Sequence, residues 1–363
     1  MSLPVGVPAP LFTAPSPTNP EFAFGSLGGR YVLLVFLPPP SPERDAAVAL
    51  VVEQAHLFRD DNAVIFAVLP DAESFSAARD SRDGMRWFAD PDGELRRLYK
   101  ALGADGELRA EWVLVDPSLR ILGCAPLDRG HEVMRLLAAM GEADNHAGTL
   151  TPAPVLVVPR ILEPGFCQDL VESFERQGGT PSGVMRLVDG KTVPVLDDFK
   201  RRRDAEIPKG PLIEGLRARL LARLLPEIAK AFQFEVTRIE RFIVARYDAE
   251  EGGYFRAHRD NTTPGTAHRK FAVSINLNDA FEGGDLRFPE FGRRTYRPPV
   301  GGAVVFSCSL LHEATPVTRG RRYATLPFLY DEAGARLRER NLHTFAAPAA
   351  EAALDPADVS PRP

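Results

Sequence analysis

Residues 246–261 read RYDAEEGGYFRAHRDN, and this stretch decides how the second half of the chain is interpreted. It ends with His258 and Asp260, two residues apart after the β-forming residues Tyr254 and Phe255. In an extended strand, side chains two residues apart point to the same side. An imidazole and a carboxylate on one side suit a divalent metal, although such a pair also occurs by chance at surface turns.

A third candidate ligand, His312, follows the apolar segment at 303–307. Two histidines and one carboxylate occupy one face of an octahedron and leave three positions open, as non-haem Fe(II) oxygenases require. Arg322 lies ten residues beyond His312 on the next expected strand. Its guanidinium offers two parallel donors, which suits the distal carboxylate of a dicarboxylate held by the metal. Arg319 and Arg321 are nearby alternatives, although strand alternation puts Arg321 on the opposite face.

The segment from about 155 to 332 resembles the prolyl-4-hydroxylase-like branch of the 2-oxoglutarate/Fe(II) oxygenases. The pieces that carry the resemblance occur in order, as RYDAEEGGYFRAHRDN (246–261), FAVSINLND (271–279), FEGGDLRFPEF (281–291) and GGAVVFSCSLLHEATPVTRGRRYAT (301–325). The resemblance implies a double-stranded β-helix, a form of jelly roll, with flanking helices. The expected strands at 238–247, 271–277, 285–288, 303–307 and 322–330, after helices at about 164–178 and 211–232, agree with it.

By the same resemblance, His258, Asp260 and His312 hold Fe(II), and no catalytic residue is expected beyond these metal ligands. Arg322 binds 2-oxoglutarate. Tyr247 lines the 2-oxoglutarate pocket, although a core role suits this residue equally well. Gly283 and Gly284 suit a tight turn, and His268 is expected at the surface.

The implied reaction hydroxylates a C–H bond with O₂ while 2-oxoglutarate is converted to succinate and CO₂. Ascorbate is a possible aid that keeps the iron ferrous. The carboxylate at Asp260 favours hydroxylation over halogenation, which takes a small residue there. The substrate is either a residue of a protein, such as proline, or a small metabolite. The alternative is a non-catalytic thioredoxin-fold scaffold or sensor with a vestigial oxygenase domain.

The first half of the chain has a different pattern, in which short apolar strands alternate with helices. The expected strands are 31–36, 64–69 and 112–115, and the expected helices are 46–59, 92–101 and 131–140. This alternation predicts an α/β domain with a mainly parallel sheet and helices on both faces.

This half resembles a peroxiredoxin, a thioredoxin-fold enzyme, in the pieces VGVPAPLFTAPS (5–16), YVLLVFLPPPSPERD (31–45), WFADPDGELRRLYKALG (87–103) and EWVLVDPSLRIL (111–122). The reactive cysteine of that family would fall at Arg44, three residues after Ser41. The first cysteine in the chain is Cys124, which we interpret as a packing residue. Because a thiolate is the nucleophile for peroxide, this domain is not expected to be a peroxidase.

The polar, turn-rich segment 141–153 separates the two halves. We therefore expect a peroxiredoxin-like domain at 1–145, an oxygenase domain at 146–335 and a disordered Ala/Pro-rich tail at 346–363. The run Lys200–Arg203 is strongly basic. It is either a solvated loop or part of a substrate-facing loop, and the sequence does not decide between them.

Composition excludes several classes of protein. A net charge of −5 over 363 residues gives no reason to expect a nucleic-acid or anionic-membrane partner. Three scattered cysteines fit a reducing cytosol rather than a disulfide framework. Neither a signal peptide nor an apolar stretch of about 18 residues is recognisable. The expected location is therefore the cytoplasm.

Overall fold

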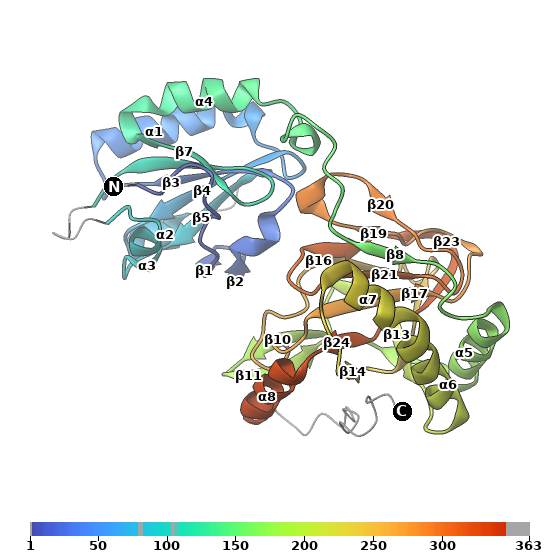
Figure 1. The fold of residues 1–363 in the computed structure, drawn as a ribbon. Helices are drawn as coiled ribbons and strands as arrows, with labels where there is room; N and C mark the ends of the chain where they lie inside the picture. Colours follow the sequence, from blue (N-terminus) through green and yellow to red (C-terminus); the bar gives the residue numbers. More distant parts are fainter. Residues whose placement is uncertain (1, 79–82, 103–105, 107, 346–363) are drawn as a thin grey trace. The chain divides into compact units, whose positions relative to one another are not determined.

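The computed structural model describes residues 2–78, 83–102, 106 and 108–345, and the tail expected at 346–363 lies outside them. The chain forms two compact units (Figure 1). The first unit consists of the residues up to Ala153 together with Phe288–Arg294. The second unit consists of Pro154–Arg287 and the residues from Thr295 onward. Within the described residues, no helix is long and apolar enough to cross a membrane.

The first unit is built on one five-stranded sheet in the order β5-β4-β3-β6-β7. Its parallel strands are β3 (Tyr31–Phe36), β4 (Ala63–Leu69) and β5 (Met85–Ala89), and its antiparallel strands are β6 (Glu111–Val115) and β7 (Ile121–Pro126). A parallel core extended by an antiparallel hairpin is the arrangement of a thioredoxin-like fold. The predicted fold class of this half is therefore confirmed, although the strands β5 and β7 were missing from the sequence interpretation.

Burial explains why these segments form the sheet. Every residue of β3 and β4 is buried, as expected for strands covered on both faces. Helices α1 (Pro42–Glu53) and α4 (Gly130–Ala139) pack on one face of the sheet and lie side by side in Figure 1. An aromatic cluster that includes Phe24, Phe66, Phe88 and Tyr99 fills the other face.

The first turn of α1 contains Arg44 where a peroxiredoxin would carry its reactive cysteine. Ser41 caps this helix, because its hydroxyl accepts a hydrogen bond from the Arg44 backbone N–H at 3.2 Å. The Arg44 guanidinium lies 3.6 Å from the Asp71 carboxylate. Cys124 is half-buried on β7, and burial together with the charge of Glu111 raises the pKa of its thiol to about 11.

The second unit contains two antiparallel sheets. The smaller has the order β12 (Lys200–Arg201), β16 (Tyr254–His258), β22 (His312–Ala314), β19 (Leu286–Arg287), β20 (Thr295–Tyr296). The larger has the order β14 (Arg238–Glu240), β24 (Phe328–Tyr330), β17 (Phe271–Asn276), β23 (Val317–Thr325), β15 (Ile243–Asp248), β13 (Arg203–Glu206), β9 (Thr180–Pro181). Strand β21 (Ala303–Ser307) pairs with β17 and with β8 (Leu156–Val158). Two such sheets form the predicted jelly roll.

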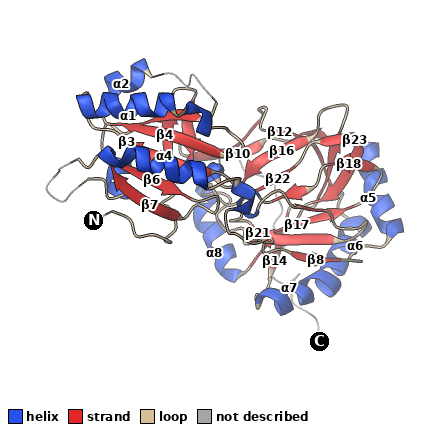
Figure 2. Ribbon diagram, turned by 90° about the horizontal axis from the view of Figure 1, so that it is seen from above, coloured by secondary structure: helices blue, strands red, loops and turns tan. Residues whose placement is uncertain are grey.

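Helices cover the outer face of the larger sheet (Figure 2). They are α5 (Pro164–Gln177), α6 (Pro211–Arg219) and α7 (Leu225–Phe232). The π-helical turn η5 (Leu220–Leu224) joins α6 to α7. The sequence predicted one helix over 211–232. Pro226 has no backbone N–H to donate, which explains why the regular hydrogen-bond ladder is interrupted at this point. The elements that were not predicted include the hairpin of β10 (Val184–Val188) with β11 (Lys191–Val195) and the helix α8 (Glu332–Asn341).

Candidate metal centre

Three side chains converge at one end of the smaller sheet. His258 is the last residue of β16 and His312 the first of β22, and the two lie opposite each other in the strand register. Asp260 follows β16, where its backbone N–H donates to the Cys308 carbonyl at 2.9 Å. The metal-ligating atoms of the three residues lie within 4.8 Å of one another. The pattern found in the sequence thus corresponds to a real cluster.

Backbone contacts fix both imidazoles in the form that a metal needs. His258 Nδ1 lies 2.8 Å from the Arg256 carbonyl oxygen, and His312 Nδ1 lies 3.0 Å from the Leu310 carbonyl oxygen. A carbonyl oxygen only accepts, so each Nδ1 carries the proton and donates it. Each Nε2 therefore presents a lone pair to the centre of the cluster, an orientation typical of metal-bound histidine.

The Asp260 carboxylate faces these two nitrogens, with its oxygens 3.5 Å from His258 Nε2 and 3.3 Å from His312 Nε2. Burial, together with the neighbouring His312, lowers the pKa of His258 to about 4. Burial by itself would raise the pKa of Asp260, but the two histidines outweigh it and hold the pKa well below its usual value. Two imidazole nitrogens and a carboxylate directed at one another fit a bound cation.

The cluster opens into a cavity of about 450 Å³, a volume that includes its open mouth. Apolar side chains line much of it, namely Phe255, Ala272, Val273, Leu286, Phe306, Ala314, Leu326 and Phe328. The polar part of the wall comes from Arg202, Arg241, Tyr247, Ser274 and Arg322. An apolar cavity with few convergent polar groups is typical of a small-molecule site.

Arg322 is 2% exposed and directs its guanidinium into this cavity. Its Nε donates to Asn276 Oδ1 at 3.0 Å and its Nη2 to Ser274 Oγ at 2.7 Å. Within the described part of the chain, no carboxylate lies in ion-pair contact with it. A buried cation held by neutral acceptors alone is costly unless an anion joins it.

Gly284 makes room for the Arg322 side chain. Its φ of +67° is a conformation that favours glycine, and a Cβ at this position would come within 2.8 Å of Val317 Cγ2 and 3.2 Å of Arg322 Cδ. The preceding Gly283 also has a positive φ, at +69°. Gly283 ends β18 (Phe281–Gly283) where its pairing with β23 is irregular, so these glycines lie at a β-bulge rather than in the expected tight turn, and Gly284 clears the path of the arginine.

The other arginines considered on β23 point elsewhere. Arg319 is 76% exposed and pairs with Glu282. Arg321 is half-exposed and pairs with Asp248. Neither residue lines the cavity, so Arg322 is the arginine of β23 that reaches it.

Tyr247, on β15, is 3% exposed and lines the cavity. Its hydroxyl lies 3.3 Å from Arg202 Nη1. Its ring lies 5.7 Å from the Arg202 guanidinium and 5.4 Å from that of Arg322. The tyrosine therefore separates two buried positive charges.

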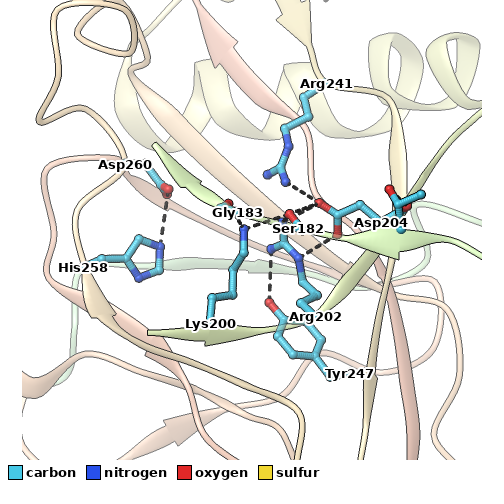
Figure 3. Close-up of polar contacts among 10 residues, drawn as sticks. Ser182, Gly183, Lys200, Arg202, Asp204, Arg241, Tyr247, His258 and Asp260 are labelled. Carbon is cyan, nitrogen blue, oxygen red and sulfur yellow. Dashed lines mark hydrogen bonds and ion pairs between the residues drawn. The ribbon is translucent and has the colours of Figure 1, made fainter. Parts of the chain in front are cut away.

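The basic run at 200–203 does not form a solvated loop. Lys200 and Arg202 (Figure 3) are buried, 8% and 6% exposed. The side chains of Arg201 and Arg203 are 52% and 32% exposed. The interpretation of the run as purely solvated is therefore wrong. Alternate residues face opposite sides of the extended strands β12 and β13, which explains the split.

His268 was expected at the surface, and this prediction is also wrong. The side chain is 1% exposed, and its Nε2 donates to Glu240 Oε2 at 2.9 Å. Arg269 Nε donates to the other oxygen of Glu240 at 2.7 Å. These residues form a buried ion-pair network outside the cavity.

Residues 242–330 match the model of the 2OG-Fe(II) oxygenase superfamily, a span that contains the whole cluster and Arg322. This region is a 2OG-Fe(II) oxygenase domain. Its family takes Fe(II), 2-oxoglutarate and O₂, and the lone pairs, the carboxylate and the buried guanidinium fit that set. The recognition of the domain from its sequence pieces is confirmed.

Curated relatives of the oxygenase domain are PKHD-type hydroxylases. The protein from Paracoccus denitrificans (strain Pd 1222) is 29% identical over 152 residues, which cover 38% of this chain and 64% of the relative. The protein from Delftia acidovorans (strain DSM 14801 / SPH-1) is 38% identical over 85 residues, covering 21% of this chain and 38% of the relative. The chain thus spans less than two thirds of the length of these relatives.

Solved structures similar to the two halves have low TM-scores. A Pseudomonas putida prolyl-4-hydroxylase is 17% identical with a TM-score of 0.37, over 52% of this chain and 96% of that one. Mycobacterium tuberculosis AhpC is 19% identical with a TM-score of 0.32, over 38% of this chain and 93% of that one.

Proposed function

We propose that this protein is an Fe(II)- and 2-oxoglutarate-dependent dioxygenase that hydroxylates a C–H bond and releases succinate and CO₂. The observation that carries the proposal is the pairing of two features in one cavity. Two Nε2 lone pairs and the Asp260 carboxylate converge on one point, and a buried guanidinium faces the same space.

The chain's own residues would divide the work as follows. His258, Asp260 and His312 hold the iron on one side and leave the remaining positions open. When bound, the iron and 2-oxoglutarate supply the oxidising power for C–H hydroxylation, the part of the reaction that side chains cannot perform. The apolar wall, including Phe306 and Leu286, keeps water from the reacting groups.

Arg322 is the proposed anchor for the distal carboxylate of 2-oxoglutarate. Its two hydrogen bonds to Ser274 and Asn276 hold the guanidinium in a fixed orientation, which lowers the entropy lost on binding. Tyr247 lies against the same guanidinium and lines the cosubstrate space. Ascorbate is included in the proposal as a reductant that keeps the iron ferrous.

The substrate is either a protein residue, such as a prolyl residue, or a small metabolite. The printed name of the relatives, PKHD-type hydroxylase, supports hydroxylation without specifying the acceptor. For the first half of the chain we propose no peroxidase activity, because Arg44 occupies the position of the nucleophile.

The direct test is succinate formation by the full-length protein supplied with Fe(II), 2-oxoglutarate and O₂ in the absence of a substrate. We expect slow, iron-dependent turnover. Replacing His312 with Ala should abolish both turnover and tight Fe(II) binding, whereas Arg319→Gln, on the exposed part of β23, should change neither. Failure of the wild-type protein to bind Fe(II) would refute the proposal.

A further inference from the structure

We propose that the substrate of this enzyme carries a carboxylate, which binds to a cationic wall formed by Arg202 and Arg241, with Lys200 beside them. This inference rests on the proposed function and specifies the chemical class of its substrate. The wall belongs to the same cavity as the metal cluster, since Arg202 and Arg241 line it beside His258 and Asp260 (Figure 3).

The wall is built around one acidic residue, Asp204. Arg202 donates to both oxygens of this carboxylate, from Nε and Nη2, at 2.7 Å each. Arg241 Nη2 donates to the same carboxylate at 2.9 Å. Asp204 therefore sets the orientation of two guanidinium groups, as a fork-to-carboxylate pair does at a recognition site.

Lys200 adds a third basic group beside them. Its Nζ donates to Ser182 Oγ at 2.8 Å and to the Gly183 carbonyl, and it lies 4.9 Å from the centre of the Phe255 ring. Within the described part of the chain, no carboxylate lies in ion-pair contact with Lys200. Arg202 and Arg241 thus contact the Asp204 carboxylate, and Lys200 lies beside them without contacting it.

The backbone of Arg241 supports a functional role for the wall. This residue lies between β14 and β15 with a φ of +68°, a conformation that is rare outside glycine. Such strain persists where the surrounding structure requires it and is frequent at ligand sites. Here it accompanies a guanidinium that reaches the cavity, so the chain accepts an unfavourable conformation at a cavity-lining charge.

Within the cavity, this wall carries more positive than negative charge. Asp260 and the two carboxylates of 2-oxoglutarate would balance the iron and Arg322, which leaves the one carboxylate of Asp204 against the two guanidinium groups of Arg202 and Arg241. Burial, then the charges of Arg202 and Arg241, lowers the pKa of Lys200 to about 5, so this amine is uncharged at neutral pH and the positive charge of the wall comes from the two guanidinium groups. A negatively charged group on the substrate would offset it, and a neutral amide would not.

The test measures binding of matched probes to the full-length protein loaded with Fe(II) and 2-oxoglutarate, without oxygen. N-acetyl-proline is compared with N-acetyl-prolinamide for a free α-carboxylate. N-acetyl-glutamate α-amide is compared with N-acetyl-glutamine amide for a side-chain carboxylate. In at least one pair we expect the carboxylate probe to bind at least about tenfold more tightly than its neutral amide, as measured by calorimetry. The reason is that hydrogen bonds to a charged group are stronger than those to a neutral group.

Two variants locate the effect. Arg241→Gln should remove the preference for the carboxylate, whereas Arg319→Gln, the same change on the exposed face of β23, should retain it. The inference is overturned if neither pair shows a preference, whether both members bind or neither does. It is also overturned if Arg241→Gln keeps the preference.

The two levels of proposal are distinguishable in one preparation. Iron-dependent succinate formation in air together with no preference for a carboxylate would refute the substrate class and leave the dioxygenase standing. Absence of Fe(II) binding and of succinate would refute the dioxygenase, and with it the inference that rests on it.

Discussion

Arg322 and Arg319 are three residues apart on β23, yet one is buried in the cavity and the other is 76% exposed. We expect Arg322→Gln to raise the KM for 2-oxoglutarate by about tenfold to a hundredfold, because a charge-assisted bidentate contact is lost. Steady-state succinate assays measure this change. Arg319→Gln is the matched control, and equal KM values in all three proteins would contradict the assignment.

A second prediction concerns the stability of the fold at acidic pH, which depends on Glu240. Burial would raise its pKa, but Arg269 and His268 outweigh burial and lower the pKa from 4.5 to about 2. A depressed carboxyl pKa stabilises the fold above the unfolded-state value, and this stabilisation disappears as the pH falls from about 4.5 to about 2. The amount is on the order of 3 kcal/mol.

Denaturant unfolding at several pH values checks this prediction. Glu240→Gln should be less stable than the wild type at neutral pH, and the difference should shrink as the pH falls through this range. Glu339→Gln, at an exposed glutamate of α8, is the control. A constant difference between wild type and Glu240→Gln over this range would be the contrary result.

At the scale of the element, the basic run at 200–203 lies along β12 and β13, where its side chains are alternately buried and exposed. Arg202→Gln should lower the free energy of unfolding by on the order of 3 kcal/mol, because it removes a buried partner of Asp204. Arg201→Gln should change it by less than about 0.5 kcal/mol, because that side chain is 52% exposed. Urea denaturation of the two variants measures both values, and similar losses would contradict the division.

The elements also show what the sequence could predict. Strand β3 was predicted with its observed bounds because a continuous apolar run is a local signal. The metal cluster was predictable because two ligands are close in sequence and the third follows a clear strand. Ser274 was missed, since a serine carries no signal until its hydrogen-bond partner Arg322 is known. Lys200 and Arg202 had a usable signal, their spacing of two, but the burial of that side depends on a tertiary arrangement that the sequence does not reveal. His268 was misplaced for the same reason.

At the scale of the molecule, the two units have different prospects for chemistry. Cys124 is half-buried and Cys167 is buried, and burial raises the pKa of each thiol to about 11. We expect no thiol-dependent peroxide consumption, and slow alkylation of these two thiols in the native protein at neutral pH, since the thiolate is the reactive form. Peroxide loss and iodoacetamide labelling measure the two outcomes. A peroxidase rate abolished by Cys124→Ser would contradict this prediction.

His258 on β16 and His312 on β22 lie opposite each other in the strand register, and this pairing has a consequence for local dynamics. The register between these two strands shifts between Phe255 and His258, so their ladder is irregular where the ligands lie. A metal held by both strands would close this weak point and shift the local opening equilibrium toward the paired state. We therefore expect backbone amides of 254–258 and 312–314 to exchange with deuterium more slowly once Fe(II) is bound, while those of β3 remain unchanged. Iron would then hold two neighbouring strands together in addition to its part in the reaction.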